Sequence, residues 1–435
     1  MPDFDLLIHG ADNVPFVGIT DRKFAAFSEG TAKTTIDATG CTLLPGVIDA
    51  HVHFNEPGRT EWEGIATGSR AAAAGGITTF FDMPLNSYPP VCYPKAFDLK
   101  LAAMREKSIV DFGLWGGLVP GNVAQMEPLA ERGVIGFKAF LSNSGIEDFH
   151  HVPFADLKLG MKEAARLNLP VGVHAESDTI TSRLTQAARS RGARGIRDYL
   201  DTRPVAAELA AIDAALDLAG ETGCALQVVH VSSAEGIHRI TAAKAAGVNV
   251  TAETCPHYLV LTSEDMERLG AVAKCAPPLR DPSVRDELLE LVREGQVDTI
   301  GSDHSPAPWS MKTSDDFFKV WGGIAGVQHL LLLLADLDLS TEQLAAVTAG
   351  NVARRFRVDY RKGSLSAGLD ADITLIRRTA PEIITPGDLL YRHAISPYVG
   401  RKLKHRIEKV ILRGRLVSPA QENTQPGGEL IRPAR

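Results

Sequence analysis

Two histidines, His51 and His53, are separated by a single residue at the end of an apolar segment. Side chains two positions apart in a β-strand point to the same face, so both imidazoles could bind one metal ion. The alternative is that they are two polar residues that end a strand and share no ligand. The pair therefore indicates a candidate metal site and leaves that alternative open.

Further polar residues follow other apolar segments in the same way. His174 follows VGV, His230 follows LQVV, and Asp303 ends DTIGSD. Each of the three, taken alone, could be a buried polar residue of a core. Together with the histidine pair they place five possible ligands at the carboxyl ends of predicted strands, where a (β/α)8 barrel has its active site. The set favours a metal centre over coincidence.

Lys138 lies within GFKAF, with apolar residues on both sides. A lysine in such a segment can extend its ammonium group to solvent. If it is desolvated instead, it loses its proton more readily and becomes a neutral amine. A neutral amine can react with carbon dioxide, and the carbamate that forms is an anionic ligand with two oxygens, able to bridge two metal ions. The residues alone do not require that step, which rests on the family resemblance described below.

Eight apolar segments with strand character alternate with helical segments and would position these side chains. The predicted strands are Leu44–His53, Ile77–Met83, Asp111–Gly117, Val134–Phe140, Val171–Ala175, Ala225–Val231, Val248–Ala252 and Val297–Asp303. This alternation predicts βα units with a parallel sheet, and eight units is the number that closes a TIM-like barrel. Two longer connections, which contain residues 177–204 and 275–280, are expected at the catalytic mouth, because long loops in compact domains are usually functional.

The two ends of the chain differ from the middle, because each offers only a few short strands around turns. Neither end could bury a core alone. We therefore predict one small composite β-sandwich domain, formed by residues 1–43 and 363–435, beside a metal-dependent (β/α)8 barrel of residues 44–362. Residues past Ser418 are rich in proline, glycine and charge and are expected to form a loosely packed tail.

The composition is that of a folded globular protein, with 44% hydrophobic and 23% charged residues in a chain of 435. A net charge of −7 argues against a nucleic-acid partner. The apolar run Leu330–Ala335 is too short to span a bilayer, and Asp3 and Asp5 stand where a signal peptide would be basic. Five scattered cysteines do not fit a disulfide scaffold or a zinc ribbon. We expect a cytoplasmic protein without a membrane partner.

The motif PGVIDAHVHFNEPG, the Lys138 segment, His174, His230 and SDHSP together resemble the cyclic amidohydrolases of the amidohydrolase superfamily. That group includes dihydroorotases, hydantoinases (dihydropyrimidinases) and allantoinases, and the resemblance extends from Leu43 to about Leu416. It implies two divalent metal ions, zinc in the first place and cobalt or manganese as alternatives. It also implies two ligand sets, which are His51, His53, N6-carboxylated Lys138 and Asp303 on one metal, and Lys138, His174 and His230 on the other.

Within this family, finer motifs look most like the allantoinase branch. They are GRTEWEG (58–64), DMPLNS (82–87), GFKAFLSNSG (136–145), KCAPPLR (274–280) and WGGIAGVQ (321–328). Dihydroorotases usually follow the histidine pair with Leu-Arg, which holds a substrate carboxylate, and here Phe54 and Asn55 stand there. Hydantoinases usually carry a tyrosine five residues after the carboxylated lysine, and here that residue is Asn143. Both departures favour allantoin, which has no carboxylate and carries polar ureido groups.

The resemblance implies that the chain hydrolyses the cyclic amide of allantoin to allantoate. Asp303 would act as base and then as acid, or as a ligand only. The alternatives are a hydantoinase or dihydropyrimidinase type of enzyme and, more distantly, a catalytically silent structural homologue, against which the complete ligand set stands. Since relatives are often tetramers, a homo-oligomer, and specifically a tetramer, is expected without a sequence argument for its interface.

Substrate contacts are expected from Asn86, from Ser305 and from the backbone of Cys275 and Ala276. Asn86 could instead be a turn residue before two prolines. His257 and His304 also lie near strand ends, and we expect them to support the site rather than bind metal.

Overall fold

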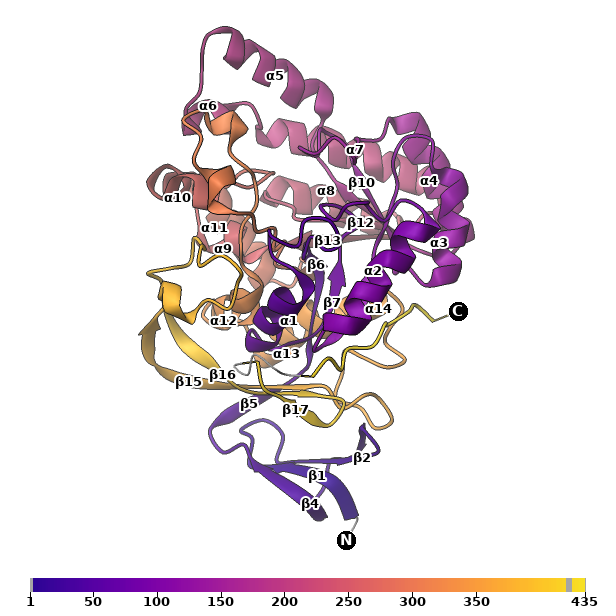
Figure 1. Ribbon diagram of the computed structural model, residues 1–435, viewed down its shortest axis with the longest axis vertical. Coiled ribbons are helices and arrows are strands. Elements are labelled where there is room, and N and C mark those ends of the chain that lie inside the picture. Colours follow the sequence, from indigo (N-terminus) through magenta and orange to yellow (C-terminus); the bar gives the residue numbers. More distant parts are fainter. Residues whose placement is uncertain (1–2, 420–424, 435) are drawn as a thin grey trace.

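Short parallel strands surround the centre of the molecule in the computed structural model, which describes residues 3–419 and 425–434 (Figure 1). The strands are β6 (Val47–Val52), β7 (Ile77–Asp82), β8 (Asp111–Leu114), β9 (Gly116–Gly117), β10 (Phe137–Phe140), β11 (Val171–His174), β12 (Leu226–Val228), β13 (Val250–Thr254) and β14 (Thr299–Ile300). All eight predicted strands are present, and Trp115 divides the third into β8 and β9.

The strands pair in sequence order and close into a barrel. One run is β6-β7-β8, and the other is β9-β10-β11-β12-β13-β14, with every pair parallel. The ends of the two runs meet where the His53 amide donates to the His304 carbonyl at 2.8 Å. The predicted TIM-like barrel is therefore confirmed.

Helices between the strands cover the outside of the barrel (Figure 1). They include α1 (Ile65–Ala74), α2 (Pro94–Lys107), α3 (Met126–Arg132), α4 (Phe154–Arg166), α7 (Val205–Thr222), α8 (Ala234–Ala245), α11 (Pro282–Arg293), α12 (Leu330–Ala335), α13 (Thr341–Ala345) and α14 (Asn351–Arg355). In α4 the buried residues Leu157, Met161 and Ala164 follow helical spacing, which explains its single apolar face. No described helix is long and apolar enough to cross a membrane.

The longer connections lie where the sequence predicted them, at the mouth of the barrel. Residues 177–204 include α5 (Asp178–Ser190) and α6 (Ile196–Asp201), and side chains of both helices line a wide outer pocket. Two further short helices, α9 (Pro256–Val260) and α10 (Ser263–Leu269), precede Cys275 and Ala276, which border the inner cavity described below. These connections therefore contain much of the wall around the site.

The two chain ends form a β-sandwich, as predicted. One sheet has the order β3-β2-β1-β4 and the other β17-β16-β15-β5. Their strands are β1 (Asp3–His9), β2 (Phe16–Thr20), β3 (Lys23–Ala26), β4 (Thr31–Asp37), β5 (Cys41–Pro45), β15 (Ile373–Ile383), β16 (Lys402–Leu412) and β17 (Arg415–Val417). Ile8 and Val17 of the first sheet share one buried core with Ile373, Leu375 and Ile411 of the second. Each sheet therefore buries the apolar face of the other.

The first predicted barrel strand, Leu44–His53, is in fact two strands with different partners. Leu44 and Pro45 belong to β5 and pair with β15 of the sandwich, whereas β6 enters the barrel. Gly46 separates them, and a Cβ there would lie 2.2 Å from the Thr78 Oγ1 atom. A glycine at this junction lets the chain pass close to β7, which an alternating apolar pattern does not reveal.

The expectation of a loose tail past Ser418 is wrong for residues 425–434. The Gly427 and Gly428 amides donate to the Ser108 carbonyl at 3.1 and 3.0 Å, and the Ile431 amide donates to the Phe112 carbonyl at 2.8 Å. Ile431 is fully buried. Backbone hydrogen bonds hold this segment beside β8. The amino-acid composition of a segment does not predict such pairing.

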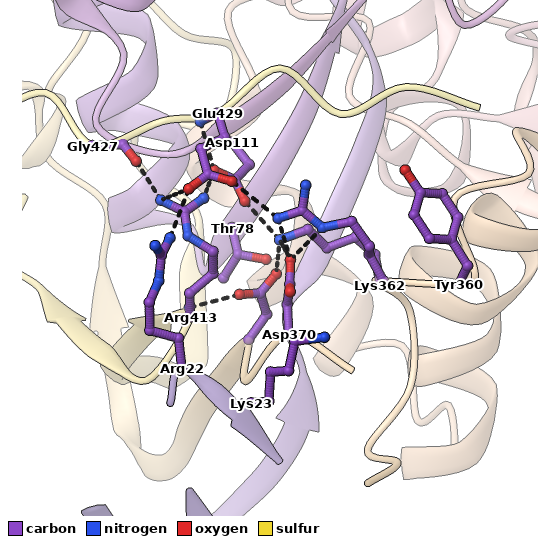
Figure 2. A network of polar contacts seen from close by, with 12 residues as sticks. Arg22, Lys23, Thr78, Asp111, Tyr360, Lys362, Asp370, Arg413, Gly427 and Glu429 are labelled. Atoms are coloured by element: carbon purple, nitrogen blue, oxygen red, sulfur yellow. Dashed lines mark hydrogen bonds and ion pairs between the residues drawn. The ribbon is translucent and has the colours of Figure 1, made fainter. Parts of the chain in front are cut away.

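A buried polar network joins the sandwich, the barrel and this C-terminal segment (Figure 2). Lys362 Nζ lies 2.6 Å from both Asp111 Oδ2 and Asp372 Oδ2. Arg413 donates to Asp111 and to the Gly427 carbonyl. Because Asp111 is the first residue of β8, the network lies at the amino end of a barrel strand. The sandwich therefore attaches opposite the carboxyl ends of the strands.

Candidate metal centre

His51, His53 and Asp303 meet at the carboxyl end of the barrel. His51 lies near the end of β6, His53 follows that strand, and Asp303 follows β14. The Asp303 Oδ1 atom is 3.2 Å from His51 Nε2 and 3.5 Å from His53 Nε2. One ligand atom of each residue lies within 4.8 Å of the others, which is a spacing that one metal ion can bridge.

A second group of donors lies beside the first. His174 ends β11, and its Nδ1 atom is 3.1 Å from His230 Nε2. The His230 ring centre is in turn 5.4 Å from that of His51. Lys138, in the middle of β10, is completely buried, and its Nζ has no hydrogen-bond partner among residues 3–419 and 425–434. An orphaned buried amine is costly, which makes Lys138 Nζ a candidate contact for a bound group.

Hydrogen bonds determine which ring nitrogen each histidine presents to the centre. His51 Nδ1 lies 2.8 Å from Glu253 Oε1, His53 Nδ1 lies 3.1 Å from the Leu85 carbonyl, and His174 Nε2 lies 2.8 Å from Glu176 Oε2. Each acceptor takes the N–H of its histidine, so the other nitrogen keeps a free lone pair. That free nitrogen faces the cluster in all three residues.

Two of these supporting groups are carboxylates that are themselves buried. Glu176 accepts from Arg203 Nε at 3.0 Å, and burial, which opposes ionisation, is outweighed by the charge of Arg203, so the pKa of Glu176 is lowered to about 2. Sequence reasoning missed Glu253. A carboxylate near the end of the apolar strand β13 was the signal that could have identified it.

Burial governs the protonation of the donors. It lowers the pKa of His51, His174 and His230, which favours the neutral imidazoles that bind metals. Burial also lowers the pKa of Lys138 and thus favours its neutral amine. For Asp303, burial would raise the pKa, but the neighbouring histidines outweigh it and keep the pKa well below its ordinary value.

The donor set fits two divalent cations. Imidazole nitrogen and carboxylate oxygen are ligands that suit zinc and other first-row metals. Lys138 Nζ lies 5.2 Å from the centre of the Phe140 ring, and that ring stacks on the His174 ring with centres 4.6 Å apart, so the amine lies beside the second group of donors. His230 and Asp303 adopt left-handed backbone angles, with φ of 42° and 45°, which are uncommon outside glycine and concentrate at functional sites.

A cavity of about 80 Å³ lies over these donors. Every residue expected to contact substrate borders it, namely Asn86, Cys275, Ala276 and Ser305. The Cys275 carbonyl already accepts from the Tyr199 hydroxyl at 2.9 Å, which fixes its direction. His257 and His304 are buried but do not border the cavity, and His304 Nδ1 instead accepts from the Gly326 amide at 3.1 Å.

The cavity is also bordered by residues that sequence reasoning did not assign to it. Ser144 and Trp321 border the cavity together with Asn143, Gly322 and Gly323. Four of these five also border the outer pocket of about 970 Å³ that α5 and α6 help to line. The donors are therefore reached from outside through a wide vestibule.

The Amidohydrolase family model matches residues 42–417. The chain is 52% identical to an allantoinase of Solibacter usitatus over 96% of this chain and 93% of the relative. It is 49% identical to an allantoinase of Rubrobacter xylanophilus over 100% and 99% of the two chains. Among solved structures, the L-hydantoinase (dihydropyrimidinase) of Arthrobacter aurescens superposes with a TM-score of 0.93 at 30% identity, covering 99% of this chain and 100% of the other.

Proposed function

This chain belongs to the amidohydrolase family, and we propose that it hydrolyses the cyclic amide of allantoin to allantoate. The observation that supports hydrolysis most directly is the convergence of five histidine and aspartate donors, together with a buried lysine that has no hydrogen-bond partner in the described part of the chain. The similarity to allantoinases over nearly the whole chain supports the choice of substrate and a hydrolase acting on cyclic amides.

Members of this family generally use a binuclear metal centre. We assign His51, His53 and Asp303 to one ion, His174 and His230 to the other, and Lys138 to both. Lys138 would bind as its carbamate, formed when the neutral amine adds to carbon dioxide and releases one proton. We infer zinc as the metal, with cobalt or manganese as alternatives. When bound, the ions supply Lewis-acid polarisation of the ring carbonyl and acidify water near neutral pH.

The residues of the chain account for the remaining steps. Asp303, whose lowered pKa keeps its carboxylate ionised, accepts a proton from the attacking water and returns it to the ring nitrogen that leaves. Asn86, Ser305, Cys275 and Ala276 border the cavity, and we assign substrate contacts to the side chains of the first two and to the backbone of the last two.

A hydantoinase or dihydropyrimidinase is the second candidate, because enzymes of those names have closely superposable structures. Asn143 favours allantoin over this candidate. It borders both the cavity and the vestibule, where a polar ureido arm would extend from the ring.

A homotetramer and a cytoplasmic location also stay predictions of the sequence, and light scattering on purified protein tests the first.

A ring-opening assay on purified, zinc-loaded protein tests the function. It compares allantoin, hydantoin, dihydrouracil and dihydroorotate, with metal content determined on the same sample. We expect a clear preference for allantoin with about two metal ions per chain. Preference for hydantoin or dihydrouracil would support the second candidate. Inactivity on all four substrates despite bound metal would refute both candidates.

A further inference from the structure

One wall of the catalytic cavity is built from a segment with little regular structure. This segment comprises residues 305–324, shortly after Asp303. Its helical structure is limited to two single turns of 3-10 helix, Trp309–Lys312 and Phe317–Lys319. Trp321, Gly322 and Gly323 of this segment border the cavity. A buried irregular segment exposes backbone carbonyls that no ladder satisfies, so they need other donors.

Lys312 supplies donors for the part of the segment next to the site. Its side chain is buried, and Nζ donates to the carbonyls of Ala271, Trp321 and Gly323 at 3.1, 3.0 and 2.8 Å. Burial lowers the pKa of Lys312 to about 7, and in its ammonium form, which has three N–H bonds, the side chain can donate to all three carbonyls at once. Two of the three belong to residues that border the cavity.

Lys274 supplies donors for the preceding part. Its side chain is also buried, and Nζ donates to the carbonyls of Phe317 and Val320, both at 2.6 Å. The same Nζ lies 4.5 Å from the centre of the Tyr199 ring. The Lys274 carbonyl accepts from the Gly323 amide at 2.8 Å, so this residue contacts the wall from both its side chain and its backbone.

Neither ammonium group forms an ion pair within the described part of the chain, although buried lysines usually have a carboxylate partner. Asp316, the nearby carboxylate, instead pairs with Arg189 at 3.2 Å. Both lysines therefore act as hydrogen-bond donors to backbone carbonyls. Removing either would leave buried carbonyls unsatisfied, which costs more than the net gain from an ordinary hydrogen bond.

The wall is also tightly packed against the catalytic side of the cavity. A Cβ at Gly323 would lie 2.1 Å from the Ser305 carbonyl oxygen, and the Ser305 amide donates to the Ile324 carbonyl at 2.9 Å. The Trp321 ring packs edge-on against Trp62 with centres 4.8 Å apart. A shift of the wall therefore changes the width of the cavity next to Asp303.

We propose that Lys312 and Lys274 are positioning residues. They hold the backbone of Trp321–Gly323 in place and so keep the cavity at the width that binds the substrate ring. The identity of the substrate in this inference rests on the proposed function. The hydrogen bonds from the two lysines to the cavity wall do not depend on that function. Neither lysine contacts the proposed metal ligands or borders the inner cavity. Lys274 borders only the outer vestibule.

Lys312→Met removes the donors and keeps the length of the side chain. For zinc-loaded enzyme acting on allantoin, we expect KM to rise about tenfold or more while kcat changes less than about threefold, because the metal centre is intact. Lys312→Gln, which keeps two N–H donors on a shorter arm, should fall between wild type and Lys312→Met. Lys274→Met should resemble Lys312→Met.

Hydrogen–deuterium exchange of amides in 317–323 gives a readout that needs no substrate. We expect faster exchange there in both methionine variants, with the metal content unchanged. Leu375→Ala, a truncation in the sandwich core, controls for lost stability and should leave KM and this exchange as in wild type. Unchanged KM and unchanged exchange in Lys312→Met and Lys312→Gln would overturn the inference. Wild-type inactivity on allantoin would refute the proposed function alone, since exchange would still report on the wall.

Discussion

The Glu253 carboxylate oxygen Oε1 lies 2.8 Å from Nδ1 of His51, and both side chains are almost completely buried. The two residues are 202 positions apart in the chain and lie on different barrel strands. A carboxylate in this position orients the imidazole and makes its other nitrogen a stronger ligand. Glu176 has the same relationship with His174, so each proposed ligand set contains one histidine supported by a carboxylate.

Glu253→Gln should weaken metal binding about 10–100-fold, because the amide supports His51 less strongly than a carboxylate does. Competition with a chromogenic chelator measures the affinity directly, without a substrate. Glu235→Gln, at an exposed position of α8, is the control and should bind metal as wild type does. Equal affinities in the two variants would show that Glu253 has no role in the metal centre.

Lys138→Ala should lose most of its metal and its activity, because the bridging ligand is absent. Short-chain carboxylic acids should restore part of both, since the vacated space can accept a free carboxylate. Metal analysis and ring-opening rates, each with and without added acid, check this expectation. A variant that keeps two metal ions and full activity without added acid would contradict the proposed bridge.

Asp303→Asn should lower kcat by about 10²–10⁴-fold, since an amide oxygen can still face a metal ion but cannot take up a proton. Metal content measured on the same preparation separates proton transfer from ligand loss. If the variant keeps its metal and also its kcat, Asp303 is a ligand only, and the two roles proposed for it are reduced to one.

The network at the far end of the barrel should make stability depend on acid pH. Burial opposes ionisation of Glu429, but hydrogen bonds from Arg22 and Arg361 and the charge of Arg413 outweigh it and lower its pKa to about 2. A lowered carboxyl pKa stabilises the fold above the ordinary value of 4.5, and this stabilisation is lost as pH falls from 4.5 towards 2.

Glu429→Gln should therefore lower the free energy of unfolding at pH 7 by about 0.5–1 kcal/mol, a small value because the side chain is partly exposed and screened by solvent. The difference from wild type should shrink as pH falls below 4.5. Urea unfolding at pH 7, 4 and 3 measures it, with Glu382→Gln at an exposed strand position as control. A difference that is constant with pH would exclude this linkage.

Much of the candidate site could be predicted because its proposed ligands lie at the ends of apolar strands. The alternation of strands and helices predicted eight βα units, and a closed barrel brings the carboxyl ends of all its strands together. His174, His230 and Asp303 could therefore be placed beside His51 and His53 without any knowledge of contacts. The composite sandwich was predictable for a related reason, because neither chain end has enough strands for a core of its own.

The remaining features depend on contacts between residues far apart in the chain, and only the tertiary structure decided them. Glu253 directly follows the predicted strand Val248–Ala252, and only the packing of β13 shows that it lies against His51. Lys274 and Lys312 look like surface lysines, and their buried role appears only when the irregular wall brings its carbonyls to them. Hydrophobic periodicity reports which face of one element is buried, whereas the choice of a polar partner depends on how separate elements pack. The sequence therefore determined the barrel and the polar residues at its strand ends, and packing determined how those side chains are oriented and enclosed.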